Sequence, residues 1–369
     1  MSDAQKPLVV IAAGGTGGHL FPAAAFAQEM FQRGWRVVLV TDARGRRYAD
    51  GFPAERIVDV PAASLTANPI KAIPAMIAIS RGVAAARKLF AEWKPALVAG
   101  FGGYPSFPAL VAARSQAIPI LIHEQNSVLG RVNRAMAKEA AIVACGFERL
   151  DRLPPQAAGH KRVVGNPVRA PILAVRERPY PNIPAGGRIC VLIIGGSQGA
   201  RLFGEIVPEA MTRLPEDLRN RLDVVQQVRE EQLGAVRRIY EEAGIKAELA
   251  PFFSNMAELY ARAHLVIARA GASSVTELQA AGRPAILVPF AAAADDHQTA
   301  NAEGLTSVGA ADLFNEDEFE PELLAGCLER RLGDPHALAV RAAAARATGK
   351  PEAAKTLADL AEGVAAPAG

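Results

Sequence analysis

Residues 8–23 read LVVIAAGGTGGHLFPA, an apolar run that passes directly into two pairs of glycines and a histidine. A continuous apolar run of this kind is typical of a strand that is covered on both faces in a parallel sheet. A glycine loop between such a strand and a helix exposes backbone N–H groups, and the positive end of the helix dipole favours an anion there. The stretch therefore predicts the opening strand, loop and helix of a doubly wound α/β domain.

The same alternation of apolar runs and helical stretches recurs along the chain. In the first half, further runs lie at residues 36–41, 96–100, 119–123 and 141–145. In the second half they lie at residues 189–196, 222–228, 247–252, 264–271 and 284–290, with helical stretches at 201–214, 229–243, 335–348 and 351–364. Because 369 residues exceed the size at which one core stops growing, we expect two Rossmann-like domains with parallel sheets, joined near Gly165 and Pro167.

Composition and charge limit the possible partners. Half of the residues are hydrophobic and 21% are charged, the balance of a globular protein. Residues 1–169 hold 21 Lys/Arg against 11 Asp/Glu, whereas residues 170–369 hold 20 against 27. The first half therefore favours an anionic partner, unless its cations simply lie on solvated helix faces. It lacks interleaved aromatic residues or a recognition helix, so we expect no nucleic acid as partner.

Compartment is indicated by the cysteines and by the apolar stretches. Cys145, Cys190 and Cys327 have no paired spacing, which argues against a disulfide framework or a zinc site. No secretory signal is visible, and the uncharged stretches 7–28 and 95–113 are interrupted by glycines and prolines, so neither is expected to span a membrane. We expect a cytoplasmic protein.

Three glycine loops follow predicted strands. They contain Gly14, Gly15, Gly17 and Gly18; Gly102 and Gly103; and Gly195, Gly196 and Gly199. The first is not a P-loop, and Leu20 stands where a dinucleotide fingerprint needs its third glycine. Asp42 ends the second strand at the distance of a ribose-binding carboxylate, so a dehydrogenase remains an alternative. Plain tight turns are the other alternative, but three loops at strand ends favour two phosphate groups.

Residues 268–290 open another helix at the end of a strand. Ser274 and Glu277 fit a capping box, and Gly282 fits the stop of the helix. Alternatively, the helix start at Ala272 and Ser273 receives a diphosphate while Glu277 accepts hydrogen bonds from a ribose. A carboxylate that is committed to capping would not reach the sugar, so the two interpretations exclude each other in one state.

Polar side chains follow other predicted strands. His123, Glu124, Gln125 and Asn126 come directly after one apolar run, and Asp295, Asp296, His297 and Gln298 come after another. The first group resembles a ligand-binding edge, whereas a solvated loop is the simpler interpretation of the second. His19 stands beside the first glycine loop, where it either caps its own loop or acts as a general base, with Glu124 as the alternative base.

Seven motifs together resemble one family of bacterial enzymes. They are GGTGGHLFPA, GFGGYPSFP, HEQNSVLGRVN, VVGNPVR, GGSQGAR, ARAGASSVTEL and DDHQTANA. In this order they are similar to the MurG family of UDP-N-acetylglucosamine transferases, glycosyltransferase family 28. The resemblance implies a GT-B fold, with two doubly wound domains that face each other across a cleft. It places the first domain at residues 1–166 with a returning helix at 345–369, and the second at residues 167–344.

The resemblance also implies an activity and a set of contacts. The family transfers N-acetylglucosamine from UDP-GlcNAc to lipid I, with inversion and without a metal or other cofactor, and yields lipid II. By motif position the donor would be contacted by Thr16, Gly17, Gly18, Asn126, Arg169, Ser197, Phe253, Ala272, Ser273, Ser274, Glu277 and Gln298. The diphosphate of the acceptor would lie against Gly14, Gly15, Gly102, Gly103 and Tyr104.

A membrane surface is the remaining expected partner. Residues 69–93 offer Ile70, Ile73, Met76, Ile77, Ile79, Phe90 and Trp93 beside Lys71, Arg81, Arg87 and Lys88, a composition that suits docking on anionic lipid. The alternative is an ordinary amphipathic core helix. The resemblance implies a peripheral protein on the cytoplasmic face of the inner membrane, with cell-wall and division proteins as further partners. An epimerase that uses UDP-GlcNAc alone and a non-enzymatic scaffold remain the competing functions.

Overall fold

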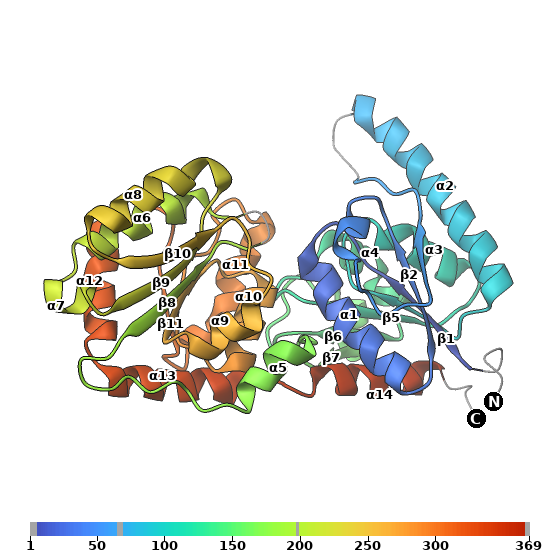
Figure 1. Cartoon of the computed structure of the whole chain (residues 1–369). Coiled ribbons are helices and arrows are strands. Elements are labelled where there is room, and N and C mark those ends of the chain that lie inside the picture. Colours follow the sequence, from blue (N-terminus) through green and yellow to red (C-terminus); the bar gives the residue numbers. More distant parts are fainter. Residues whose placement is uncertain (1–5, 65–68, 197–198, 366–369) are drawn as a thin grey trace. The chain divides into compact units, whose positions relative to one another are not determined.

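The computed structural model describes residues 6–64, 69–196 and 199–365. The chain divides into two compact units (Figure 1). Unit 1 comprises residues 1–169 and 351–369, and unit 2 comprises residues 170–350. Residues 345–350, which the sequence assigns to the returning helix, belong to unit 2. Residues 345–348 form the last turn of helix α13 (Pro335–Thr348), which packs on α10 (Ala272–Ala281).

Unit 1 is built on a parallel sheet with the strand order β3-β2-β1-β4-β5-β6-β7. Its strands are β1 (Leu8–Ala12), β2 (Arg36–Thr41), β3 (Arg56–Asp59), β4 (Leu97–Gly100), β5 (Ile120–Glu124), β6 (Ile142–Cys145) and β7 (Lys161–Val163). Its α-helices are α1 (Gly17–Gln32), α2 (Pro69–Trp93), α3 (Ser106–Ser115), α4 (Arg131–Met136) and α14 (Ala353–Ala365). Short 3₁₀ turns lie at Gly45–Tyr48, Ala137–Glu139 and Pro155–His160.

Unit 2 repeats this plan with the strand order β10-β9-β8-β11-β12-β13, again parallel. Its strands are β8 (Ile189–Ile194), β9 (Leu222–Gln227), β10 (Lys246–Ala250), β11 (Leu265–Ala268), β12 (Ala285–Leu287) and β13 (Ala311–Leu313). Besides α10 and α13, its α-helices are α5 (Ala170–Arg176), α6 (Arg201–Thr212), α7 (Glu216–Arg219), α8 (Leu233–Glu242), α9 (Met256–Arg262), α11 (His297–Thr306) and α12 (Pro321–Leu332). Its 3₁₀ turns are Glu230–Gln232 and Ala294–Asp296.

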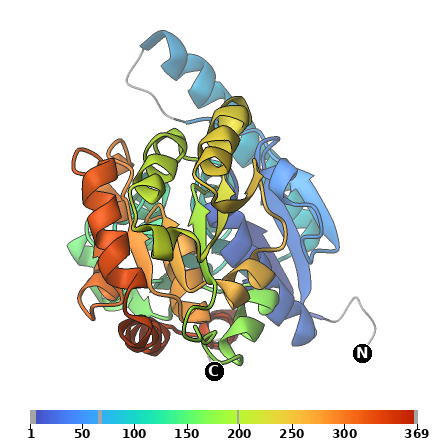
Figure 2. The ribbon, with the colours of Figure 1, turned by 60° about the vertical axis from the view of Figure 1, so that its left-hand side comes forward.

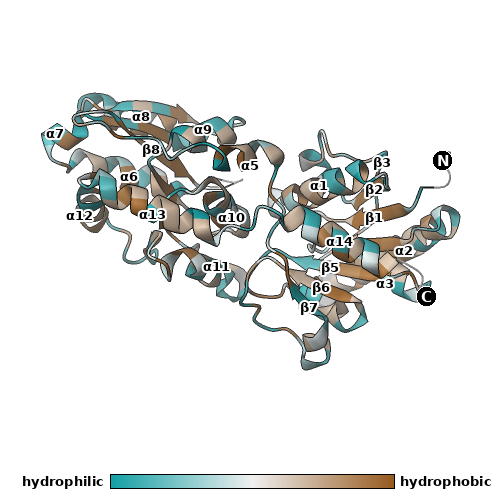
Figure 3. Cartoon of the chain, turned by 90° about the horizontal axis from the view of Figure 1, so that it is seen from below, coloured by the Kyte–Doolittle hydropathy of each residue, from teal (hydrophilic) through white to brown (hydrophobic). Residues whose placement is uncertain are grey.

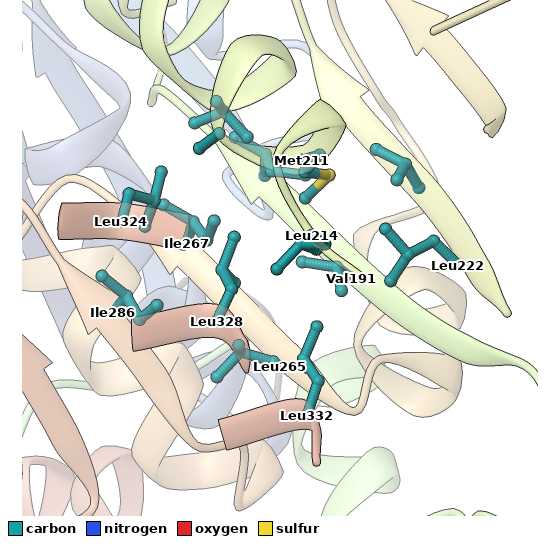
Figure 4. Close-up of a cluster of buried hydrophobic side chains, with 14 of the residues drawn as sticks. Val191, Met211, Leu214, Leu222, Leu265, Ile267, Ile286, Leu324, Leu328 and Leu332 are labelled. Carbon is teal, nitrogen blue, oxygen red and sulfur yellow. The ribbon is translucent and has the colours of Figure 1, made fainter. Parts of the chain in front are cut away.

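The inner strands of each sheet are buried on both faces, as the apolar runs predict. In unit 1, Val9 and Ile11 of β1 pack with α1 and α14, whereas Leu8 and Val10 pack on the opposite face with α2 and α3. In unit 2, Leu324, Leu328 and Leu332 on one face of α12 lie against the strand side chains (Figure 4). The prediction of two Rossmann-like doubly wound domains is therefore confirmed.

Three short strands escaped the sequence patterns. β3 and β7 are the two edges of the sheet of unit 1, and β13 is an edge of the sheet of unit 2. Each contains side chains that are at least partly exposed, so none shows the continuous apolar run by which the inner strands are recognised.

Helix α14 returns to unit 1 after the chain has completed unit 2. Leu357, Ala358 and Ala361 lie in the same buried cluster as the side chains of α1. Arg33, just after α1, donates hydrogen bonds to Asp359 and Glu362 at 2.7 and 2.8 Å. Figures 1 and 3 both show α14 beside α1, so this helix is part of the fold of unit 1 and not an appendage.

Each sheet has one point at which the strand order reverses, between β1 and β4 in unit 1 and between β8 and β11 in unit 2. Ligands of open α/β sheets bind outside the carboxyl ends of the strands at such switch points. The glycine loops after β1, β4 and β8 and the start of α10 after β11 all lie there.

Candidate functional site

Helix α1 begins at the switch point of unit 1 and is open at its start. Thr16 is the N-cap residue in an extended conformation, and no side chain in the described ranges caps the helix. Gly17 and Gly18 form its first two positions, where backbone N–H groups lack partners within the helix. This end of α1 therefore has the geometry of an anion site.

The glycine loop after β4 packs directly on the loop after β1. Gly103 has a φ of 75°, and a Cβ atom on it would lie 2.6 Å from the carbonyl oxygen of Gly14. A Cβ on Gly14 would in turn lie 2.7 Å from Pro105. Only glycines allow the two loops to approach this closely. The structure thus packs the loop that contains Gly14 and Gly15 against the loop that contains Gly102 and Gly103.

Asp42 is hydrogen-bonded to the second of these two glycine loops. Its carboxylate accepts hydrogen bonds from the Tyr104 hydroxyl at 2.7 Å and from the backbone N–H of Gly45 at 2.9 Å. Burial and the neighbouring carboxylate raise the pKa of Tyr104. Because the proton of Tyr104 is committed to Asp42, this hydroxyl does not donate to a diphosphate; its contribution is to hold the loop. The carboxylate that suggested a dehydrogenase is likewise occupied by the protein itself.

His19 lies in the first turn of α1, half-buried against the second glycine loop. A Cβ on Gly102 or on Gly103 would lie 3.3 Å from the imidazole ring. The Nδ1 atom of His19 is 3.0 Å from Oε1 of Gln125, which follows β5. The side chain of Gln125 is otherwise buried against His123. His19 therefore does not cap its own loop, because its ring is bonded to another strand end.

Glu124, the alternative base, is buried and fully engaged. Its Oε1 atom accepts from the backbone and side-chain nitrogens of Asn126 at 3.1 and 3.3 Å. Its Oε2 atom accepts from the backbone N–H of Gly130 and from Asn133 Nδ2, both at 2.9 Å. This carboxylate fixes the loop that carries Asn126, a residue predicted to contact the donor sugar.

Arg169 ends the first stretch of unit 1. Its guanidinium lies 4.4 Å from the centre of the Phe21 ring, on the same helix as His19. The cation–π contact holds the side chain near the start of α1. Of the residues predicted for this half of the chain, the structure thus gathers His19, Asn126 and Arg169 around the first switch point.

The start of α10 corrects one prediction. Gly271 is the N-cap residue, so Ser273 and Ser274 lie inside the first turn, and no described side chain caps the helix. The capping box of Ser274 and Glu277 is therefore wrong, because Ser274 is already helical. Gly282 does end the helix, in the left-handed conformation with φ 63°. The buried Oγ atom of Ser273 has no hydrogen-bond partner among the described residues.

The other residues of unit 2 that are predicted to contact the donor lie in segments that follow the carboxyl ends of β10, β11 and β12. Glu277 is half-buried one turn into α10, and Phe253 is buried in the loop after β10. Gln298, in the first turn of α11, accepts a hydrogen bond from the backbone N–H of Phe290 at 3.0 Å through Oε1. Ser197, predicted to contact phosphate, lies outside the described residues.

Two further residues of unit 2 support this edge without having been predicted. Gln227 ends β9; it accepts from the backbone N–H of Gly195 at 2.9 Å and donates to the carbonyls of Gly196 and Pro251. Arg269, after β11, forms an ion pair with Glu316 at 2.5 Å. In the sequence, the only sign of this role is that a polar amide, Gln227, ends the apolar run of β9, the strand beside the one that the glycine loop follows.

Helix α2 has one exposed and one buried end. Ile73, Met76 and Ile77 are 65%, 60% and 48% exposed, on turns that extend beyond the rest of unit 1 in Figures 1 and 2. Phe90 is in the core and Trp93 is stacked under Arg56, so these two are not available for docking, contrary to prediction. The side chains of Ile70 and Lys71 lie outside the described part. None of the described helices is both long and apolar enough to cross a membrane.

Comparison with known proteins identifies the relatives of the chain. Glycosyltransferase family 28 models match it twice, the N-terminal domain over residues 9–145 and the C-terminal domain over residues 190–357. Two curated relatives, from Maricaulis maris and Caulobacter vibrioides, bear the name UDP-N-acetylglucosamine--N-acetylmuramyl-(pentapeptide) pyrophosphoryl-undecaprenol N-acetylglucosamine transferase. They are 54% and 49% identical and cover 96% and 97% of this chain, and 97% and 99% of their own lengths. A crystal structure of Acinetobacter baumannii MurG matches with a TM-score of 0.78 and 32% identity, over 97% of this chain and 99% of that one.

Proposed function

The chain belongs to glycosyltransferase family 28, among the transferases that act on undecaprenyl-pyrophosphate-linked N-acetylmuramyl pentapeptide, and from this premise we propose how its residues divide the reaction. The protein is an N-acetylglucosamine transferase that uses UDP-GlcNAc as donor and lipid I as acceptor. Unit 1 receives the acceptor and the proton, and unit 2 holds the donor nucleotide.

His19 is the general base. The muramyl 4-hydroxyl attacks the anomeric carbon in a single inverting displacement, UDP leaves, and the hydroxyl proton passes to the imidazole. The observation that carries this assignment is the position of His19 between two glycine loops at the switch point, while both oxygens of Glu124 are engaged by Asn126, Gly130 and Asn133. An imidazole can accept a proton from a hydroxyl through a ring nitrogen that carries a lone pair. Glu124 accordingly positions Asn126 and does not take the proton.

The donor is held by unit 2. The open start of α10, with Ala272, Ser273 and Ser274, and the loop after β8 stabilise the departing diphosphate through backbone N–H groups and the helix dipole. Glu277 accepts from the ribose, the backbone at Phe253 reads uracil, and Gln298 binds the sugar. Thr16, Gly17, Gly18, Asn126 and Arg169 approach the donor from unit 1. The unpartnered Oγ of Ser273 supports this arrangement.

The acceptor diphosphate binds to the paired loops of unit 1. Backbone N–H groups around Gly14, Gly15, Gly102 and Gly103 supply the hydrogen bonds, and Tyr104 stiffens the loop through Asp42. The excess of Lys and Arg in residues 1–169 favours such a ligand.

The decisive experiment measures UDP release from UDP-GlcNAc with and without a short-chain lipid I analogue. Release only with the acceptor is expected, and Glu277→Ala should raise the KM for UDP-GlcNAc about tenfold because a charged hydrogen bond to the ribose is lost. Glu258→Ala, on α9, is the matched control. Turnover of UDP-GlcNAc alone to an isomer would overturn the assignment in favour of an epimerase.

The exposed end of α2 docks on an anionic lipid surface, which makes the protein a peripheral one. Ile73, Met76 and Ile77 enter the interface while Arg81, exposed on the same helix, stays at the headgroups. The triple change of these three residues to Gln should abolish sedimentation with phosphatidylglycerol vesicles, whereas Val340→Gln, at an exposed position of α13, should not. Equal sedimentation of both variants would contradict docking through α2.

A further inference from the structure

We propose that Gln125 and His123 are positioning residues that hold His19 in one tautomer, with its proton on Nδ1 and its lone pair on Nε2. The inference deepens the assignment of His19 as base and rests on it. Three side chains and one backbone carbonyl form the chain of contacts, which runs from Gly165 through His123 and Gln125 to His19.

The direction of each hydrogen bond in this chain can be worked out by starting from the carbonyl oxygen of Gly165. His123 Nε2 lies 3.0 Å from the carbonyl oxygen of Gly165, and a carbonyl oxygen only accepts. His123 therefore carries its proton on Nε2, and in the neutral ring Nδ1 is an acceptor. Burial lowers the pKa of His123 to about 4, so the ring is neutral at the pH at which enzymes of this kind work.

The amide of Gln125 is oriented by two independent contacts. Its Nε2 atom lies 3.0 Å from His123 Nδ1 and 3.1 Å from the carbonyl oxygen of His123. Both partners accept, so the amide nitrogen must face them and Oε1 must face away. Gln125 is 1% exposed, and Asn166 donates to its backbone carbonyl at 3.0 Å. The orientation is therefore fixed without reference to His19.

His19 meets the oxygen end of that amide. Because Oε1 of Gln125 only accepts, the His19 nitrogen 3.0 Å away must be an N–H, and the other ring nitrogen holds the lone pair. The hydroxyl proton of the acceptor is then transferred to Nε2, which leaves an imidazolium whose Nδ1–H bond to Gln125 is unchanged. A neutral amide orients the ring without stabilising the imidazolium as a carboxylate would.

Other titratable groups lie on the elements packed around His19. They are Asp42 after β2, Tyr104 after β4 and Glu124 on β5, with Arg169 stacked on Phe21 of α1. Asp42 is bonded to Tyr104 and Gly45, and Glu124 to Asn126, Gly130 and Asn133. The direct partner of the His19 Nδ1 atom is therefore the amide of Gln125.

The first test observes the tautomer itself. In the full chain labelled with ¹⁵N-histidine, NMR should show His19 protonated on Nδ1 and not on Nε2 above its pKa, with the signal assigned by its loss in His19→Ala. Gln125→Leu should mix the two tautomers. An Nε2–H tautomer in the parent protein would overturn the inference, whatever the activity.

The second test measures kinetics. Gln125→Leu should lower kcat on the order of 10-fold to 100-fold and change the KM for UDP-GlcNAc little. Gln125→Glu keeps the shape of the side chain but places a carboxylate beside Nδ1, which should move the acid limb of the kcat profile up by about one pH unit. Gln116→Leu, at a glutamine bonded to the backbone of α2, is the matched control and should behave as the parent.

The outcomes separate this inference from the assignment of the base. If His19→Ala retained full kcat, His19 would not be the base, and NMR alone would still decide the tautomer. If His19→Ala lost activity while Gln125→Leu and Gln125→Glu kept the parent kcat and pH profile, the base would stand and the positioning role would fall.

Discussion

The turn between β1 and α1 in unit 1 and the turn between β11 and α10 in unit 2 occupy equivalent places, since each follows a strand beside the switch point of its sheet. Both helices start without a capping side chain among the described residues, and both offer backbone N–H groups to an anion. The first turn of α1 carries His19, bonded to a buried amide, whereas that of α10 carries Ser273 and Ser274 and no titratable group. The uncapped helix start is thus present in both units, but only the copy in unit 1 carries a titratable side chain in its first turn.

The largest effect should follow removal of the imidazole. His19→Ala should lower kcat by about 10²-fold to 10⁴-fold, because a positioned base contributes that much to proton transfer. Binding of UDP-GlcNAc, measured by calorimetry, should remain. His336→Ala, at an exposed position of α13, controls for the loss of a histidine. If His19→Ala kept the kcat of the parent, the turn before α1 would not differ from the turn before α10 in accepting a proton.

The second effect is a pH dependence of stability in unit 1. His123 binds a proton only near pH 4 when folded, but near pH 6.5 when unfolded, so protons favour the unfolded state as the pH falls between these values. Unit 1 should lose up to about 3 kcal/mol over this interval. Hydrogen exchange of peptides from β5 measures the loss. In His123→Gln the stability of β5 should change much less with pH; an unaltered slope would show that another group titrates.

A smaller effect on the free energy of unfolding should distinguish a steric clash between the two glycine loops from the strain of a positive φ alone. Gly103→Ala and Gly186→Ala both place a side chain at positive φ, but only the first meets an atom, the carbonyl oxygen of Gly14. Gly186→Ala should cost about 1 kcal/mol, and Gly103→Ala about 1–3 kcal/mol more. Urea unfolding measures the difference. Only Gly103→Ala should also reduce kcat/KM, since its loop contacts His19.

The smallest effect is expected at the second turn. Ser273→Ala removes one neutral hydrogen bond to the donor, worth about 1 kcal/mol, so the KM for UDP-GlcNAc should rise about fivefold with kcat little changed. Ser115→Ala, whose hydroxyl bonds only within α3, is the control. A fall in kcat equal to that of His19→Ala would show that the two turns do not differ in the way described.

Continuous apolar runs were sufficient to predict the inner strands, because burial on both faces leaves a local pattern in the sequence. The edge strands β3, β7 and β13 leave no such pattern, since their side chains are partly exposed. Glycines marked the switch points for a similar reason, as close approach demands them locally. At α10 the capping box of Ser274 and Glu277 was wrong, because the helix begins at Ala272, where the alternative interpretation placed its start.

The contacts of His19 could not be predicted in the same way. Gln125 lies 106 positions from His19, and Gly165 lies 42 positions from His123. A pattern in the sequence suggests which residue types follow a strand, but not which of them meet once strands from different parts of the chain lie side by side. For the same reason the apolar residues of α2 gave no sign that Phe90 is covered while Ile73 is exposed.

The return of α14 to unit 1 determines which unit can finish folding first during translation. Leu357, Ala358 and Ala361 fill the core beside α1, yet they leave the ribosome only after all of unit 2. Unit 2 has its complete set of strands and helices earlier, whereas one face of the sheet of unit 1 is covered by α1 but still lacks α14. A chain that ends before α14 would leave apolar side chains of unit 1 accessible to chaperones and proteases. The site around His19 can therefore form completely only after translation has reached α14.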